Sequence, residues 1–295
     1  MGAVSEAVTE GQLVPLRVRV ELAHAAVQRL AESCGVDLLH VKGPAVDPGL
    51  RGHDGRGTDA DVLVRPAHVR RFLAALHAHG WRTETTFGAG SAFDHAANLY
   101  HSSWGLLDVH RLFPGMDRDP AAAFEVLWAE RVSRDLGHVP CPVPSPLGQS
   151  LLLLLHAART RTGGVHPDVG PNWTLRTEDE RRHLRTLAER TGATVGLAAA
   201  TGELGVHAGS REAALWEVFA GDDDRLGEWR ARWRSARGPA AKASVAVRSL
   251  GVNRYYLRQR LGREPRGADV ALAFVHRLGT GTRALLVRGT RRVRR

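Results

Sequence analysis

The chain has 295 residues, of which 43% are hydrophobic and 24% charged, values typical of a globular protein large enough for two domains. Its two cysteines exclude a disulfide framework and a four-cysteine zinc site, and the lack of any eighteen-residue uncharged apolar run excludes a transmembrane protein. The formal net charge of +10 would suit a polyanionic partner, but six arginines within the last thirteen residues leave the rest of the chain only mildly basic.

The first part of the chain predicts a mixture of helices and strands. Apolar residues at helical spacing predict a helix over residues 18–34, and an apolar run predicts a strand over 36–41 that ends in the turn Lys42-Gly43-Pro44. The glycine-rich stretch 48–58 predicts a loop without regular structure. The segments expected next are a strand over 59–64, a helix from Pro66 to Gly80, and short strands over 81–87, 95–101 and 104–110.

From Asp119 onward the pattern becomes mainly helical. Asp119 and Pro120 are the residue types of an N-cap and a first helical position, and the proline-rich stretch 140–146 is typical of a domain boundary. We therefore predict an α+β fold in which a domain over residues 1–140, a small mixed β-sheet flanked by helices, precedes a mainly α-helical domain over 141–295. Helices in the second domain are expected after Pro146, after the capping box of Thr177 and Glu180, and at about 209–220, 222–236, 240–261 and 268–278.

Three aspartates lie inside predicted strands. Asp59 and Asp61 are two residues apart, so side-chain alternation places both on one face of the strand. Asp108 lies in a later apolar strand and would complete a cup of three carboxylates if the two strands are neighbours. Such acids repel one another unless a cation neutralises them, and oxygen ligands suit Mg²⁺ or Mn²⁺. The cup fits two-metal phosphoryl or nucleotidyl transfer, while the alternative is a pair of acids at an exposed strand end.

Two further features near these acids point to phosphate chemistry. The Lys42-Gly43 turn follows a strand and precedes a helix start, an arrangement whose backbone N–H groups can hold phosphate, although an ordinary turn explains it equally well. His110 shares a strand face with Asp108, where it would orient a carboxylate or contact the nucleotide, or pack as a half-buried histidine. We take Lys42, Gly43 and His110 as candidate nucleotide-binding residues.

The order of these segments resembles the family called uncharacterised nucleotidyltransferases, within the DNA polymerase β-like nucleotidyltransferase superfamily. The residues that carry the resemblance are LHVKG at 39–43, TDADVLV at 58–64 and LDVHRL at 107–112, and the likeness covers residues 20–135. It implies a small mixed sheet, Asp59, Asp61 and Asp108 as metal ligands, and Lys42-Gly43 at the triphosphate.

The chain departs from this pattern in two places. The superfamily's usual Gly-Ser turn is Lys42-Gly43 here, which leaves the hydroxyl contact to phosphate unfilled. The family's arginine before the acid pair has two counterparts, Arg51 and Arg56, and we take Arg56 as the nucleotide-binding candidate.

The resemblance implies an enzyme that uses Mg²⁺ or Mn²⁺ to transfer a nucleoside monophosphate from an NTP, with ATP expected, to an unidentified acceptor. The acceptor is expected to be a small molecule, a peptide or protein, or an RNA end, and pyrophosphate is released. The alternative is a non-catalytic module on the same fold that binds nucleotide, RNA or an acidic protein, the last two through the Arg-rich tail. A third interpretation is a hydrolase or phosphotransferase with the same metals. The acidic N-terminus has no secretory leader, so we expect a cytoplasmic protein.

Overall fold

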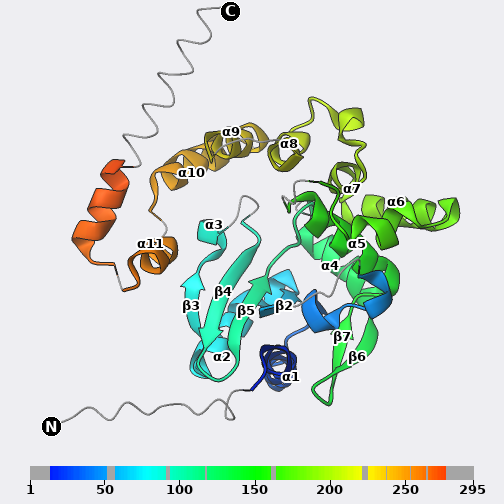
Figure 1. Cartoon of the computed structure of the whole chain (residues 1–295), viewed down its shortest axis with the longest axis horizontal. Helices are drawn as coiled ribbons and strands as arrows, with labels where there is room; N and C mark the ends of the chain where they lie inside the picture. Colours follow the sequence, from blue (N-terminus) through cyan, green and yellow to red (C-terminus); the bar gives the residue numbers. More distant parts are fainter. Residues whose placement is uncertain are drawn as a thin grey trace, which may run out of the picture.

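A five-stranded sheet lies at the centre of the first half of the chain (Figure 1). Its strand order is β1-β2-β5-β4-β3, with β2 and β5 parallel and the other neighbours antiparallel. The strands are β1 (Leu38–Val41), β2 (Asp59–Val64), β3 (Arg82–Thr85), β4 (Ala96–His101) and β5 (Gly105–His110). The computed structural model describes residues 14–51, 57–90, 94–116, 118–160, 164–220, 225–236, 238–252, 254–263 and 265–276.

One face of the sheet packs against two helices, α1 (Leu16–Ser33) and α2 (Val69–Ala78). Val62 of β2 is fully buried in this layer, together with Val27 of α1 and Phe72 of α2. Because strand side chains alternate, the residues on either side of Val62 face the opposite way. The acids predicted at 59 and 61 therefore project from the other face of the sheet, together with Leu63.

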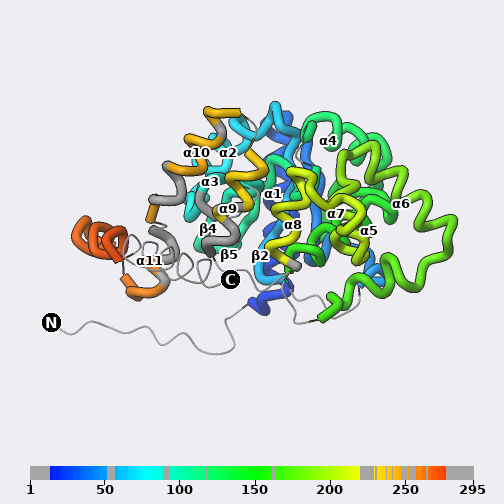
Figure 2. Tube along the Cα trace, turned by 90° about the horizontal axis from the view of Figure 1, so that it is seen from above, coloured from blue at the N-terminus to red at the C-terminus, as the bar shows by residue number. Residues whose placement is uncertain are grey.

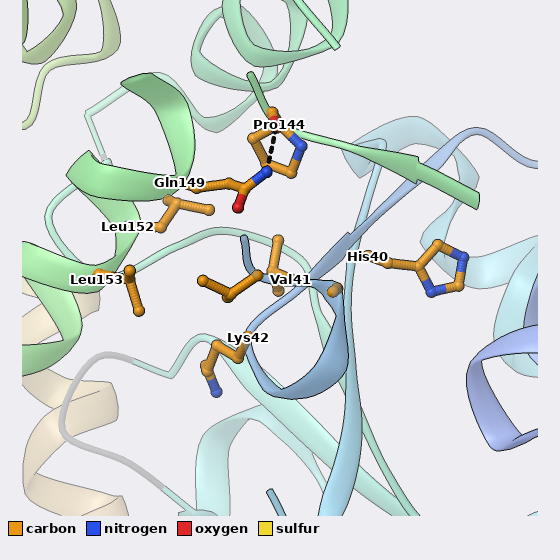
Figure 3. A pocket seen from close by; sticks show the side chains of 9 residues that line it. His40, Val41, Lys42, Pro144, Gln149, Leu152 and Leu153 are labelled. Carbon is orange, nitrogen blue, oxygen red and sulfur yellow. Dashed lines mark hydrogen bonds between the residues drawn. The ribbon is translucent and has the colours of Figure 1, made fainter. Parts of the chain in front are cut away.

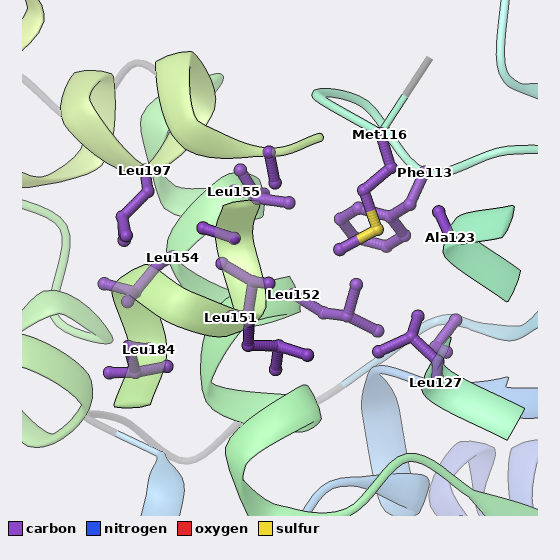
Figure 4. Close-up of a cluster of buried hydrophobic side chains, with 14 of the residues drawn as sticks. Phe113, Met116, Ala123, Leu127, Leu151, Leu152, Leu154, Leu155, Leu184 and Leu197 are labelled. Carbon is purple, nitrogen blue, oxygen red and sulfur yellow. The ribbon is translucent and has the colours of Figure 1, made fainter. Parts of the chain in front are cut away.

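A second apolar core joins that other face to the helical half (Figure 4). Leu63 of β2 packs in one cluster with Leu127 of α4 (Pro120–Ala129) and with Leu151 and Leu155 of α5 (Pro146–Ala158). The cluster continues into α6 (Glu178–Thr191) and α7 (Thr194–Thr201), where Leu184 and Leu197 are buried. The sheet face that carries the acids is thus bounded by helices from the second half of the chain.

The remaining helices run as an arc from α7 back toward β3 (Figures 1 and 2). Arg258 of α11 makes an ion pair with Glu84 of β3, so the end of the arc contacts the edge of the sheet. None of the described helices is long and apolar enough to cross a membrane. The other elements are α3 (Phe87–Gly90), α8 (Ala213–Ala220), α9 (Arg225–Ser235), α10 (Gly238–Leu250), α11 (Arg254–Leu261), a helical stretch at 267–276, and short helices at Gly43–Ala45, Pro48–Leu50, Pro66–His68, Gly170–Thr174 and Leu204–His207.

The mixed α+β class is confirmed, and several local predictions change. The proline-rich stretch forms β7 (Val139–Val143), which pairs with β6 (Val132–Leu136) in a separate hairpin. Prolines are tolerated there because a two-stranded ribbon leaves one side of each strand without hydrogen-bond partners. The single helix expected over 240–261 is divided at Gly251 into α10 and α11. The division into domains 1–140 and 141–295 stays a prediction, and the Arg-rich tail lies outside the described residues.

Candidate active site

The parallel pairing of β2 with β5 brings the predicted acids together. Asp61 of β2 lies directly opposite Asp108 of β5 in the register, and His110 follows on the same face. One ligand atom from each of these three residues lies within 4.8 Å of the others. Asp59 projects from the same face two residues before Asp61, at the start of β2. The two strands are neighbours, as the three-carboxylate cup requires.

Burial and mutual repulsion make the acids hard to ionise together. Burial, and then the negative charges of Asp61 and Asp59, raise the pKa of Asp108 to about 7. Burial and the charge of Asp61 likewise raise the pKa of Asp59 to about 6. Burial would also raise the pKa of Asp61, but Lys42 and His110 outweigh it and hold that pKa below its usual range. One carboxylate is thus neutralised by the chain, while two require additional positive charge to ionise fully near neutral pH.

Lys42 supplies the neutralising charge from a strained backbone position. Its φ is 58° and its ψ is −171°, a combination that costs about 1–3 kcal/mol for a residue with a side chain. The ammonium makes an ion pair with Asp61 and lies 3.5 Å from His110 Nε2. His110 Nε2 in turn lies 2.8 Å from Asp61 Oδ1. Gly43 follows with φ 45°, so the strand turns sharply into a single 3₁₀ turn. The predicted Lys42-Gly43 turn therefore lies beside the acids.

Of the two candidate arginines in the glycine-rich stretch, Arg51 contacts the Lys42-Gly43 turn. Arg51 Nη2 donates a hydrogen bond to the carbonyl oxygen of Gly43 at 3.0 Å, and its guanidinium is close enough to Asp61 to interact electrostatically. Arg56 lies outside the described residues. A Cβ at Gly57 would stand 3.3 Å from Gly43 Cα, so the chain after this stretch passes close to the turn.

A glutamine from the helical half contacts the segment that follows the turn. Gln149 of α5 accepts a hydrogen bond from the backbone N–H of Asp47 at 2.7 Å and donates one to the carbonyl oxygen of Pro144 at 2.8 Å. Gln149 and Pro144 line a small, mostly apolar pocket together with Val41 and Lys42 (Figure 3). The position of the turn is thus set partly by α5.

Asn98 was missed by the sequence analysis. It lies on β4, opposite Asp108 in the antiparallel register with β5. Its Nδ2 donates to Asp108 Oδ1, and its Oδ1 accepts a hydrogen bond from Thr85 Oγ1 of β3. The available signal was a polar amide inside the otherwise apolar run AANL, at 96–99. Asn98 therefore orients a candidate ligand from the side away from Asp61.

A buried histidine pair lies on the far side of the turn. His24 of α1 and His40 of β1 are fully buried, and their Nδ1 atoms are 2.8 Å apart. Burial lowers the pKa of His24 to about 4, so the ring is neutral at pH 7. A Cβ at Gly43 would lie 4.0 Å from His24 Nε2, which places the pair directly behind the Lys42-Gly43 turn.

The donor set fits a hard divalent cation. Asp61 and Asp108 offer carboxylate oxygens within reach of one another, and Asp59 adds a third on the same face. Burial and the neighbouring negative charges raise the pKa values of Asp59 and Asp108, and a bound cation would favour the ionised form of both acids. Oxygen ligands of this type favour Mg²⁺ or Mn²⁺, and His110 adds one imidazole nitrogen.

Comparisons with known proteins identify a family and structural relatives. The model of a family described as uncharacterised nucleotidyltransferase matches residues 12–189, more than half of the chain. None of the curated proteins matches. The chain is similar to the lincosamide antibiotic adenylyltransferase LnuA, solved with lincomycin bound, with 18% sequence identity over 57% of this chain and 95% of that one and a TM-score of 0.34.

Proposed function

The chain belongs to the uncharacterised nucleotidyltransferase family, and we propose that it transfers a nucleoside monophosphate from an NTP, ATP in the first instance, to an acceptor with release of pyrophosphate. The observation that carries this proposal is the pairing of Asp61 with Asp108 across β2 and β5, with Asp59 on the same face. The acceptor is a small molecule, a peptide or protein side chain, or an RNA end. We assign its recognition to the predicted helical domain, residues 141–295.

Three acids have the position and chemistry to hold Mg²⁺ or Mn²⁺: Asp59, Asp61 and Asp108. When bound, the ions would neutralise the triphosphate and make an attacking hydroxyl more acidic. Lys42 and Gly43 lie where they can contact the triphosphate, and His110 orients Asp61 through a hydrogen bond from Nε2. The same site contains Arg51, whose side chain braces the Gly43 carbonyl.

In the transfer, the acceptor oxygen forms a bond to the α-phosphorus while the bond from that phosphorus to the oxygen of the leaving pyrophosphate breaks. The acceptor's proton needs a base within reach, and Asp108 lies opposite Asp61 on the face of the sheet where the acceptor would meet the triphosphate. We assign proton acceptance to a carboxylate oxygen of Asp108. Asn98 holds that carboxyl group in place through its Nδ2.

A second candidate function is a non-catalytic module that binds nucleotide. The observation that favours it is the ion pair between Lys42 and Asp61, because a cation of the chain itself occupies one of the carboxylates. Such a module would bind an NTP without consuming it.

The test is to incubate the protein with Mg²⁺, each of the four NTPs and a panel of acceptors, and to follow pyrophosphate, orthophosphate and product mass. Nucleotidyl transfer gives pyrophosphate and an acceptor heavier by one nucleotidyl group (a nucleoside monophosphate less one water), and the Asp61→Asn and Asp108→Asn variants lose both. Asp119→Asn is the matched control, since Asp119 caps α4 through the N–H of Ala122 and asparagine caps equally well. Orthophosphate alone would indicate a hydrolase, and nucleotide-dependent thermal stabilisation without any product would indicate the binding module.

A further inference from the structure

A half-buried arginine from the helical half, whose Nε atom is fully buried, lies at the border of the acid site. Arg159 follows the last residue of α5, and its Nη1 donates to His95 Nε2 at 2.9 Å while its Nη2 donates to His156 Nδ1 at 3.4 Å. The ring of His95 lies 5.1 Å from that of His110, centroid to centroid, and His110 in turn contacts Asp61. Arg159 is therefore separated from the acids by two imidazole rings.

No carboxylate of the described residues pairs directly with Arg159, and its counter-charges, Asp61 and Asp108, act on it from a longer distance. Among the described residues, no carboxylate lies within ion-pair distance of its guanidinium, and both of its side-chain partners are imidazole nitrogens. A guanidinium has only donors, so His95 Nε2 and His156 Nδ1 must both accept, and both rings are neutral. Burial, and then the charge of Arg159, lower the pKa of His156 to about 3 and that of His95 further still. A cation bound to Asp61 and Asp108 would take up their charge, and the charge of Arg159 would then need another anion.

Two buried N–H groups at the same place have no acceptor. Because His95 accepts at Nε2, its proton is on Nδ1, and this Nδ1–H is buried without a hydrogen-bond partner in the described part of the chain. The Nε–H of Arg159 is likewise buried without a hydrogen-bond partner among the described residues. An unmatched buried donor costs free energy that a hydrogen-bonded ligand would recover. Two unmatched donors beside a guanidinium without a direct ion pair are a recognition pattern for an anion.

The position of Lys42 narrows the choice of anion. The ammonium of Lys42, from the sheet, and the guanidinium of Arg159, from the helical half, both lower the pKa values of His95 and His156, so both cations lie near these two imidazole rings. A planar guanidinium matches the oxygens of a phosphate group particularly well. The proposed reaction brings phosphate groups to this side of the sheet.

We propose that Arg159, held in orientation by His95 and His156, binds a phosphate group of the ligand at the acid site. This inference rests on the proposed function for the place of that ligand. The phosphate comes either from the triphosphate of the NTP or from a phosphate carried by the acceptor, and the experiment below separates these sources.

The test measures binding by calorimetry in wild type, Arg159→Gln and Arg159→Lys, with Mg²⁺ present. The matched control is Arg181→Gln, because Arg181 is also a half-buried arginine of the helical half but donates to the carbonyl oxygens of Trp173 and Thr174, away from the acids. In the first arm the probes are tripolyphosphate, ATP and adenosine. In the second arm the probe is inorganic phosphate, added to protein saturated with a non-hydrolysable ATP analogue.

Loss of a charge-assisted hydrogen bond predicts that Arg159→Gln raises the Kd of its phosphate ligand roughly 10-fold to 100-fold. Adenosine binding stays unchanged, which a general disturbance of the fold would not allow. Arg159→Lys keeps the charge but loses the planar guanidinium, so its Kd for the phosphate ligand should lie between those of wild type and Arg159→Gln. If Arg159→Gln does not fold, as judged by circular dichroism, Arg159→Lys tests the inference instead. In that variant the affinity for ATP should fall while the affinity for adenosine stays unchanged.

A loss confined to the first arm identifies the NTP as the source of the phosphate, and a loss confined to the second arm identifies the acceptor. Unchanged affinity for tripolyphosphate, ATP and phosphate in the Arg159 variants overturns the inference and leaves the proposed function standing. Wild-type protein that binds tripolyphosphate but never transfers a nucleotide would contradict the proposed function instead, while the effect of Arg159 on tripolyphosphate would still be measured.

Discussion

Replacing Lys42 by methionine removes a buried positive charge while keeping the length of the side chain. The side chain of Asp61 is 5% exposed and that of Lys42 16%, so water cannot take over the neutralisation of the carboxylate. Breaking a buried pair by removal of one partner typically costs about 3–5 kcal/mol, because the other charge stays buried. Methionine keeps the backbone strain at φ 58°, so the loss reports the ammonium alone.

The expected result is a fall of about 3–5 kcal/mol in the free energy of unfolding of Lys42→Met in EDTA, measured by urea denaturation. For a protein of this size the same loss lowers Tm by roughly 6–20 °C. The double variant Lys42→Met, Asp61→Asn should recover much of the loss, since a neutral amide has no charge to bury. Lys42→Gly should be more stable than Lys42→Met by about 1–3 kcal/mol, because glycine adopts this backbone conformation without strain.

Mg²⁺ extends the test to the metal site. An ion bound by Asp61 replaces the lost ammonium, so Mg²⁺ at 100 times its Kd should return about 2.7 kcal/mol to Lys42→Met. The double variant, which lacks the carboxylate, should gain less. The reasoning is refuted if Lys42→Met is as stable as wild type in EDTA, or if Mg²⁺ stabilises the single and double variants equally.

Three further predictions follow from other parts of the molecule. Asn98→Ala removes the donor that orients Asp108 and should raise the Mg²⁺ concentration needed for half-maximal activity by about 10-fold to 100-fold, with the free energy of unfolding as the control measurement. Gly196→Ala would place a Cβ 2.5 Å from a buried leucine side chain and should cost about 1–3 kcal/mol in urea, whereas Gly205→Ala, with nothing within 4 Å, should not; equal effects would contradict the packing argument. His24 is neutral in the fold because burial lowers its pKa from 6.5 to about 4, so the folded state binds fewer protons than the unfolded one, and stability present above pH 6.5 is lost as the pH falls toward 4. The free energy of unfolding lost through this group is about 3 kcal/mol. In denaturation series from pH 7 to pH 4, His24→Leu should flatten the dependence of that free energy on pH.

Local sequence patterns determined the elements that short-range physics controls. The strand at 59–64 follows from its apolar alternation, and the cap of α4 by Asp119 follows from a side chain that reaches a backbone N–H three residues away. The alternation also determined that Asp59 and Asp61 share a face. The same patterns were wrong where competing signals were close together, as at Gly251, which divides one expected helix, and at 140–146, where prolines are accommodated in a hairpin.

The sequence by itself determined which residues carry charge into the sheet, because a period of two along each strand is a local property. Only the tertiary structure decided that β2 lies parallel to β5 with Asp61 opposite Asp108, since strand pairing joins residues far apart in the chain. The same holds for the contact of Asn98 with Asp108 on β5 and for that of Arg159 with His95, which join residues of different segments of the chain. A charge buried beside another charge gains its pKa and its chemistry from that three-dimensional neighbourhood, and the neighbourhood exists only once the sheet and the helical half have packed together.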